Sequence, residues 1–82
     1  MKVKPLKSRL VRYVQRHSLF KKYGKQSKLL EQNIKHPSLN TEKLNPKEFK
    51  LYSFRIDRKY RAVFTVTDQG EIEIVDINDH YK

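Results

Sequence analysis

The sequence predicts an α+β domain in which two N-terminal helices pack on one face of a small antiparallel sheet. Apolar residues recur at helical spacing in the first half of the chain and alternate with polar residues in the second half. The 82 residues suffice for one such unit with a small core, so residues 1–82 are expected to form a single domain.

The first half predicts two helices. From Leu6 to Tyr23 the apolar side chains recur at helical spacing, with an interruption near Ser18, and Gly24 follows as a glycine stop would. A second helix is expected over residues 26–35, because Pro37 would end it.

Two further segments have no helical pattern. Residues 1–4 alternate between apolar and polar side chains, which is compatible with a short edge strand stopped by Pro5. Residues 38–50 are polar and predict a connection, with Leu39, Leu44 and Phe49 as its apolar anchors.

The second half predicts a meander of three strands, at about 51–56, 60–67 and 71–77. The even-numbered residues of the first two strands are mostly apolar, so these residues are expected to face the helices. The third strand is less regular, because Ile74 and Ile77 fall on opposite parities. Either a β-bulge or burial on both faces would explain this change.

The turns of the meander set an unusual charge arrangement. A three-residue first turn, over residues 57–59, places Arg55 directly opposite Arg61 on the face away from the helices. Like charges in this position destabilise a sheet, so the pair is expected either to splay into solvent or to bind an anion.

The second turn, which contains Gly70, extends this register along the third strand. If Thr67 pairs with Glu71, Arg61 falls opposite Ile77, and the C-terminal residues emerge at the same end of the sheet. The residues expected together at this corner are Arg55, Arg61, His80 and Tyr81.

The composition narrows the classes of partner. A net charge of +10 favours polyanions, which are nucleic acid, an anionic membrane surface or an acidic protein. Without cysteine there is neither a disulfide framework nor a thiolate metal site. The apolar runs are too short to span a membrane and no secretory signal precedes them, so a cytoplasmic location is expected.

Four short motifs follow one another in the second half. They read Glu42-Lys43-Leu44, Tyr52-Ser53-Phe54-Arg55-Ile56, Tyr60-Arg61-Ala62-Val63-Phe64 and His80-Tyr81. Their order and spacing resemble those of the RelE/ParE superfamily of bacterial toxins. The adjacent His-Tyr pair is most similar to the YoeB/Txe branch of that superfamily.

This resemblance implies a RelE-like, microbial-ribonuclease-like fold and a toxin of a type II toxin–antitoxin system. Such a toxin is a metal-independent endoribonuclease, an mRNA interferase that acts usually at the ribosome, and an acidic antitoxin protein neutralises it. Neither a metal nor a cofactor is implied. The catalytic residues carried over from the resemblance are Glu42, Arg61, His80 and Tyr81. The residues expected to bind RNA phosphates are Arg55, Arg58, Lys59 and Lys50.

These residue types suit RNA cleavage by the ribose 2′-OH. The reaction needs a base for that hydroxyl, a cation for the charged transition state and an acid for the leaving 5′-oxygen. In this scheme Glu42 is the base, Arg61 and Arg55 hold the phosphate, and His80 is the acid. Tyr81 would stack on a base or orient the phosphate.

Other interpretations of the same residues stay open. Glu42 stands among lysines and would also fit a solvated loop, while the two arginines would also fit an exposed sheet face. His17 and His36 have no partner in the expected register. The alternative functions are a ParE-like toxin that inhibits a protein such as gyrase, and an inactive relative that only binds RNA.

Overall fold

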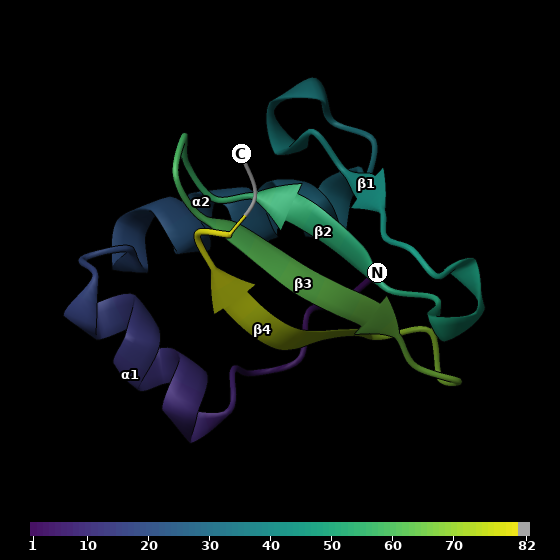
Figure 1. Cartoon of the computed structure of the whole chain (residues 1–82), viewed down its shortest axis with the longest axis horizontal. Coiled ribbons are helices and arrows are strands. Elements are labelled where there is room, and N and C mark those ends of the chain that lie inside the picture. The colour runs from purple at the N-terminus through teal and green to yellow at the C-terminus, as the bar shows by residue number, and fades with distance from the viewer. Residues whose placement is uncertain (81–82) are drawn as a thin grey trace.

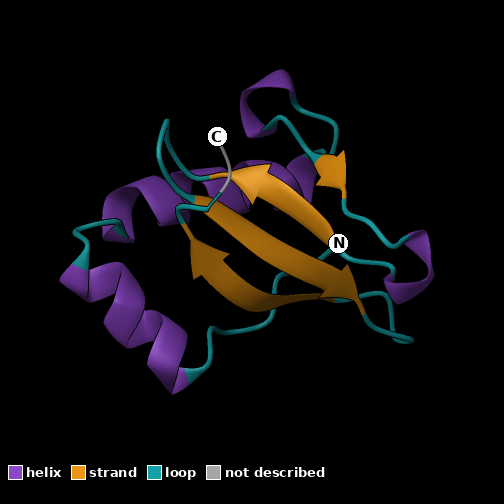
Figure 2. Cartoon of the chain, viewed as in Figure 1, coloured by secondary structure: helices purple, strands orange, loops and turns teal. Residues whose placement is uncertain are grey.

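The computed structural model describes residues 1–80 and has two layers, with the helices on one face of a four-stranded sheet (Figure 1). The chain forms two helices first and then the four strands (Figure 2). One short 3-10 helix lies between the second helix and the first strand, and another lies between the first and second strands. The elements are α1 (Ser8–Arg16), α2 (Phe20–Gln32), η1 (Pro37–Leu39), β1 (Glu42–Lys43), η2 (Lys47–Phe49), β2 (Tyr52–Arg55), β3 (Arg61–Val66) and β4 (Ile72–Asn78). The predicted α+β class is confirmed.

The first helix ends at Arg16, so the interruption expected near Ser18 is confirmed and divides the helical pattern of residues 6–23 between two helices. Ser18 takes the left-handed conformation, with φ 55°. The backbone N–H of Leu19 then donates to Val14 O at 2.8 Å, which closes the helix end. Leu19 is buried at this corner, so burial of a leucine holds a turn that would ordinarily carry glycine.

Gly24 is therefore not a helix stop but lies inside α2. An added Cβ at this glycine would meet no atom within 4 Å. The second helix also begins earlier than expected, at Phe20, and it ends at Gln32.

The sheet has the order β1-β2-β3-β4, and all neighbouring strands are antiparallel. The predicted pairing of Arg55 with Arg61 is confirmed. The second turn also has the predicted pairing, because the N–H of Thr67 donates to Glu71 O at 2.8 Å.

A β-bulge accounts for the irregular third strand. Val63 pairs with Asp76 and Phe64 with Ile74, so Val75 is the extra residue. The bulge turns Ile77 to the same buried side as Ile74. It also shifts the register by one residue, so Arg61 lies opposite Asn78 and not opposite Ile77 as expected.

The two sheet edges differ from the sequence expectation. Residues 42–43 were expected in a polar connection, but they form the edge strand β1, with Glu42 opposite Ser53. At the other edge, Val3 makes a single parallel bridge to Ile72, which is all that forms of the edge strand compatible with residues 1–4.

Side chains from both layers meet in one hydrophobic core. As expected, the even-numbered residues of β2 and β3 contribute to it, except Val66, which is exposed at the end of β3. The buried members of this core are Leu10, Val14, Leu19, Leu30, Leu39, Phe54, Ile56, Tyr60, Ala62, Phe64, Ile72, Ile74 and Ile77. Burying a large apolar side chain contributes about 1.5–3 kcal/mol, so this core holds the sheet face rigidly under the residues of the opposite face.

Candidate active site

Arg61 is the most constrained residue of the predicted site. Only 7% of it is exposed, so Arg61 does not splay into solvent, which was one of the two expectations for the arginine pair. Its Nη2 donates to Asn40 O at 2.6 Å and to Ser53 O at 3.2 Å, and its Nε donates to Ser53 Oγ at 3.0 Å. Arg61 therefore links the segment before β1 to strand β2.

Glu42 lies beside this guanidinium. Its Oε1 is 3.6 Å from Arg61 Nη2, and 55% of its side chain is exposed. Glu42 pairs with Ser53 across β1 and β2. An accessible carboxylate is thus held next to a buried cation, on the sheet face away from the helices.

Ser53 and Asn40 belong to this arrangement, and the sequence analysis missed both. Ser53 is fully buried, and its hydroxyl accepts a hydrogen bond from Arg61. A small polar residue within an alternating strand was a usable signal for Ser53. Asn40 contributes its backbone carbonyl, which any residue type could supply, so its side chain gave no signal.

Arg55 extends the positive charge along the same face. It pairs directly with Arg61, and its side chain is exposed. Its backbone carbonyl accepts a hydrogen bond of 2.7 Å from Nε2 of Gln26, a buried residue of α2 that also donates to Ser38 O. The end of β2 is therefore fixed to the helix layer.

The turn after β2 carries two more of the predicted cations, Arg58 and Lys59, and both are exposed. Asp57 shapes this turn by accepting the backbone N–H groups of Lys59 and Tyr60 at 2.9 and 2.8 Å. Burial raises the pKa of Asp57, but these hydrogen bonds and the ammonium of Lys22 outweigh burial, so its pKa lies below the ordinary value of 3.8.

His80 follows β4 at the same end of the sheet. Asn78 pairs with Arg61, and Asn78 Oδ1 accepts the backbone N–H of His80 at 3.2 Å. The side chain of His80 is exposed. Tyr81 lies outside the described residues.

Lys50 is separated from the other predicted residues. It is exposed and precedes the start of β2, whereas Arg55 is at the end of that strand. The structure therefore brings Glu42, Arg61 and Arg55 together, with His80 at the same end of the sheet, and it leaves Lys50 at the far end of β2.

The two remaining histidines both have partners, contrary to expectation. His17 Nδ1 is 3.1 Å from the hydroxyl of Tyr60, and its ring lies 4.3 Å from that of Tyr13 between centroids. Burial, followed by the negative potential of Tyr60 and of two nearby aspartates, raises the pKa of Tyr13. His36 Nδ1 accepts the N–H of Ser38 at 3.2 Å and so caps η1.

Residues 1–80 contain neither a membrane-spanning helix nor a metal-binding cluster. None of the described helices is both long and apolar enough to cross a membrane. No group of three or more histidines, cysteines, aspartates or glutamates in this part of the chain is arranged to hold a metal ion.

The fold matches solved structures of toxins. A YoeB/ParE toxin from Agrobacterium tumefaciens is 23% identical, with 99% of this chain and 100% of that chain covered and a TM-score of 0.71. YoeB in a YoeB-YefM complex from Staphylococcus aureus is 28% identical, with 98% and 94% covered and a TM-score of 0.69. A YoeB dimer from the same organism is also 28% identical over the same shares, with a TM-score of 0.66.

No family model matches the sequence, and no curated protein matches it either. The structural matches nevertheless cover nearly the whole chain. The chain has the fold of these toxins. The YoeB structures support its resemblance to the RelE/ParE superfamily of toxins. Within that superfamily, the chain is similar in structure to YoeB.

Proposed function

We propose that this toxin is a metal-independent endoribonuclease that cleaves mRNA, at the ribosome and in the cytoplasm. The observation that carries the proposal is the pair formed by Glu42 and Arg61. It combines an exposed carboxylate with a cation that a rigid sheet and three hydrogen bonds hold in place. Charge stabilisation by such fixed groups is a large part of catalysis.

In the proposed reaction Glu42 removes the proton of the ribose 2′-OH. The 2′-oxygen then bonds to the adjacent phosphorus, the bond from phosphorus to the 5′-oxygen breaks, and His80 supplies a proton to that leaving oxygen. The products are a 2′,3′-cyclic phosphate and a 5′-hydroxyl. Arg61 and Arg55 stabilise the negative charge that develops on the phosphate. Tyr81 is proposed to orient the phosphate or stack on a base.

We further propose that an acidic antitoxin covers this end of the sheet. The net charge of +10 would attract such a partner at long range. One of the solved relatives is itself a YoeB-YefM complex, which supports a protein partner of this kind. Arg58 and Lys59, which are exposed beside Arg55, are available to both the antitoxin and RNA.

One observation favours a second function. The hydrogen bonds of Arg61 to Asn40 and Ser53 would also serve a purely structural role. A toxin with a structural Arg61 would act on a protein target such as gyrase, or would only bind RNA.

The test is expression of the toxin in bacteria without an antitoxin. The nuclease should arrest growth and produce discrete, translation-dependent breaks in cellular mRNA, detected by primer extension. Growth arrest with intact transcripts and inhibited gyrase would instead assign the ParE-like function. A Glu42→Gln strain expressed to the same level provides the control for breaks that arise from stress alone.

A further inference from the structure

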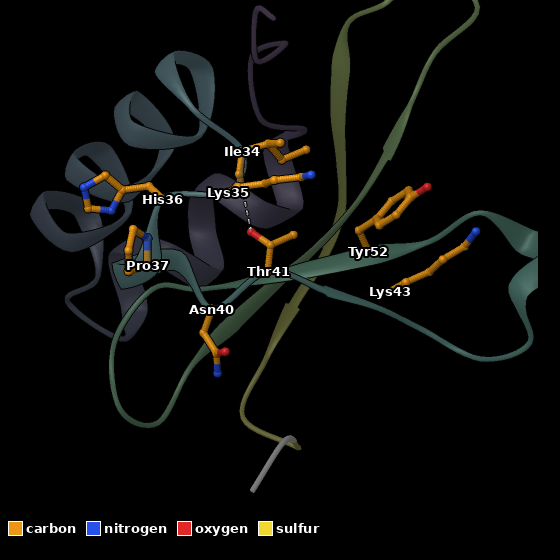
Figure 3. Close-up of a pocket in the computed structure, with 8 residues that line it drawn as sticks. All are labelled: Ile34, Lys35, His36, Pro37, Asn40, Thr41, Lys43 and Tyr52. Carbon is orange, nitrogen blue, oxygen red and sulfur yellow. Dashed lines mark hydrogen bonds between the residues drawn. The ribbon is translucent and has the colours of Figure 1, made fainter.

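A groove opens at the outer edge of the sheet, next to the candidate active site. It has a volume of about 470 Å³ and is lined by residues 34–37, 40, 41, 43 and 52 (Figure 3). Sites for small ligands usually measure about 300–1,000 Å³, so this groove is large enough for a nucleotide. We refer to it below as the edge groove.

The edge groove combines an aromatic ring with positive charge. Tyr52 and Lys43 pair across β1 and β2, and Lys43 Nζ lies 5.8 Å from the centroid of the Tyr52 ring. The Tyr52 ring also stacks on Phe64, at 5.5 Å between centroids. Lys35 is exposed at the groove, and neither lysine forms an ion pair with a carboxylate among residues 1–80.

The walls of the groove are fixed before any ligand binds. The hydroxyl of Thr41 donates to Ile34 O at 2.7 Å, which ties the segment before β1 to the segment after α2. Figure 3 shows this bond between the two sides of the groove, with the side chains of Tyr52 and Lys43 beyond it. A preformed groove loses less free energy to ordering when a ligand enters.

The edge groove adjoins the candidate active site at Asn40 and at strand β1. Asn40 lines the groove, and its carbonyl is the acceptor 2.6 Å from Arg61 Nη2. Glu42 and Lys43 are successive residues of β1, so their side chains point to opposite faces of the sheet. Since β1 is the edge strand of the sheet, no further strand separates the two faces there.

We propose that the edge groove is a binding subsite for single-stranded RNA and that it holds a nucleotide next to the phosphate that is cleaved. Tyr52 stacks on the base, while Lys43 and Lys35 neutralise flanking phosphates. This combination of an aromatic platform with cations is how proteins hold single-stranded nucleic acid without reading its sequence strictly. The proposal rests on the proposed ribonuclease function. It adds the position of the part of the RNA that lies next to the scissile phosphate.

The test is the affinity of the folded protein for a fluorescein-labelled RNA decamer with 2′-O-methyl riboses, which cannot be cleaved, measured by fluorescence anisotropy. Replacing both groove lysines, by Lys35→Gln and Lys43→Gln, should weaken binding about tenfold or more. The slope of log K against log salt should also become shallower by about 0.7 for each lost phosphate contact. Lys47→Gln, which changes an exposed lysine outside the groove, should alter the affinity much less.

Tyr52 supplies a second, independent readout. Tyr52→Phe keeps the ring and should bind nearly as the wild type does, whereas Tyr52→Leu should bind at least about fivefold more weakly. Because Tyr52 packs on Phe64, each variant is first checked by thermal unfolding. If Tyr52→Leu does not fold, the lysine variants alone decide, because both lysines are exposed.

The outcomes separate the subsite from the ribonuclease function. A wild-type protein that cleaves RNA, with groove variants that bind RNA as tightly as Lys47→Gln does, would overturn the subsite and leave the nuclease intact. Groove variants that lose an acidic protein partner but keep their RNA affinity would also overturn it. A wild-type protein that cleaves RNA neither free nor on ribosomes would contradict the proposed function itself.

Discussion

At the scale of single residues, Arg61 serves the fold and the proposed chemistry together. Its guanidinium donates hydrogen bonds to the carbonyl of Asn40 and to the hydroxyl of Ser53. A buried acceptor left without its donor costs about 1–3 kcal/mol. The loss of activity on mutation therefore has to be separated from the loss of stability.

Arg61→Ala is accordingly expected to lower the free energy of unfolding by about 1–3 kcal/mol and to abolish RNA cleavage. Arg61→Lys should restore little of either, because an ammonium cannot reproduce the forked contacts of a guanidinium. Denaturant unfolding and cleavage by the fraction that is folded measure the two effects separately. Arg58→Ala, which removes an exposed arginine from the adjacent turn, is the comparison and should only weaken RNA binding. An Arg61→Ala protein of unchanged stability that still cleaves RNA would show that Arg61 is needed neither for stability nor for cleavage.

Asp57 gives stability that depends on pH. Its pKa in the folded chain is lower than the ordinary value of 3.8, so its ionised form stabilises the fold at neutral pH. This contribution is complete above the unfolded-state pKa and is lost as the pH falls through the lower folded-state pKa. Subtracting the unfolding free energy of Asp57→Asn from that of the wild type should give a difference that is constant near neutrality and shrinks below about pH 4. A difference that grows on acidification would show that the pKa of Asp57 is raised by folding and not lowered.

At the scale of elements, the two helices contain a paired test of backbone conformation. Ser18 carries a side chain where φ is 55°, and Gly24 lacks one inside a helix with open space around it. Ser18→Gly relieves the left-handed strain, and Gly24→Ala restricts the unfolded chain, so each should stabilise by about 0.5–1 kcal/mol. For a domain of this size that is a rise of several degrees in Tm.

Two control substitutions test whether backbone conformation is the cause of these changes in stability. Ser18→Ala keeps a Cβ at the strained position and should not stabilise. Gly70→Ala puts a Cβ at φ 81° in the second turn and should destabilise. Calorimetry of the four variants measures all these changes. If Gly24→Ala instead destabilised the protein, the glycine would be required for a reason other than a lack of room for a Cβ atom.

The same elements show how far the sequence could predict the fold. Strands β2, β3 and β4 were predictable because apolar residues alternate along the face toward the helices. The break in that alternation at Ile77 was compatible with the bulge that is present and equally with burial on both faces. The break between the helices was expected near Ser18, but its geometry was not predictable, because that turn depends on the burial of Leu19 and not on a glycine. β1 was missed because two residues are too few to show a period.

The candidate site was predictable to a similar degree and for similar reasons. The opposition of Arg55 and Arg61 followed from turn length, and His80 was expected at the same end as them. The burial of Arg61 could not be foreseen, because it depends on the segment around Asn40 folding over the guanidinium. Lys50 was grouped with the site by charge alone, and charge does not fix position along a strand.

At the scale of the whole molecule, charge and shape have separate roles. A net charge of +10 favours polyanions at long range, and this attraction weakens as the salt concentration increases. Cleavage at one bond requires a fixed carboxylate and a fixed cation, which the protein presents at one end of its sheet. RNA binding is therefore expected to depend strongly on salt, whereas the chemical step depends on Glu42.

The most direct measurement is cleavage by the purified toxin, with EDTA present, of a labelled RNA both free and on programmed ribosomes. The wild type should produce 2′,3′-cyclic phosphate ends and leave uncut a substrate with 2′-deoxyribose at the cleaved position. Glu42→Gln, which keeps the size of an exposed side chain, should fold normally and lower the single-turnover rate by about 10²–10⁴. A folded Glu42→Gln protein that cleaves as fast as the wild type, or a wild type that leaves both RNAs intact, would contradict the proposed mechanism.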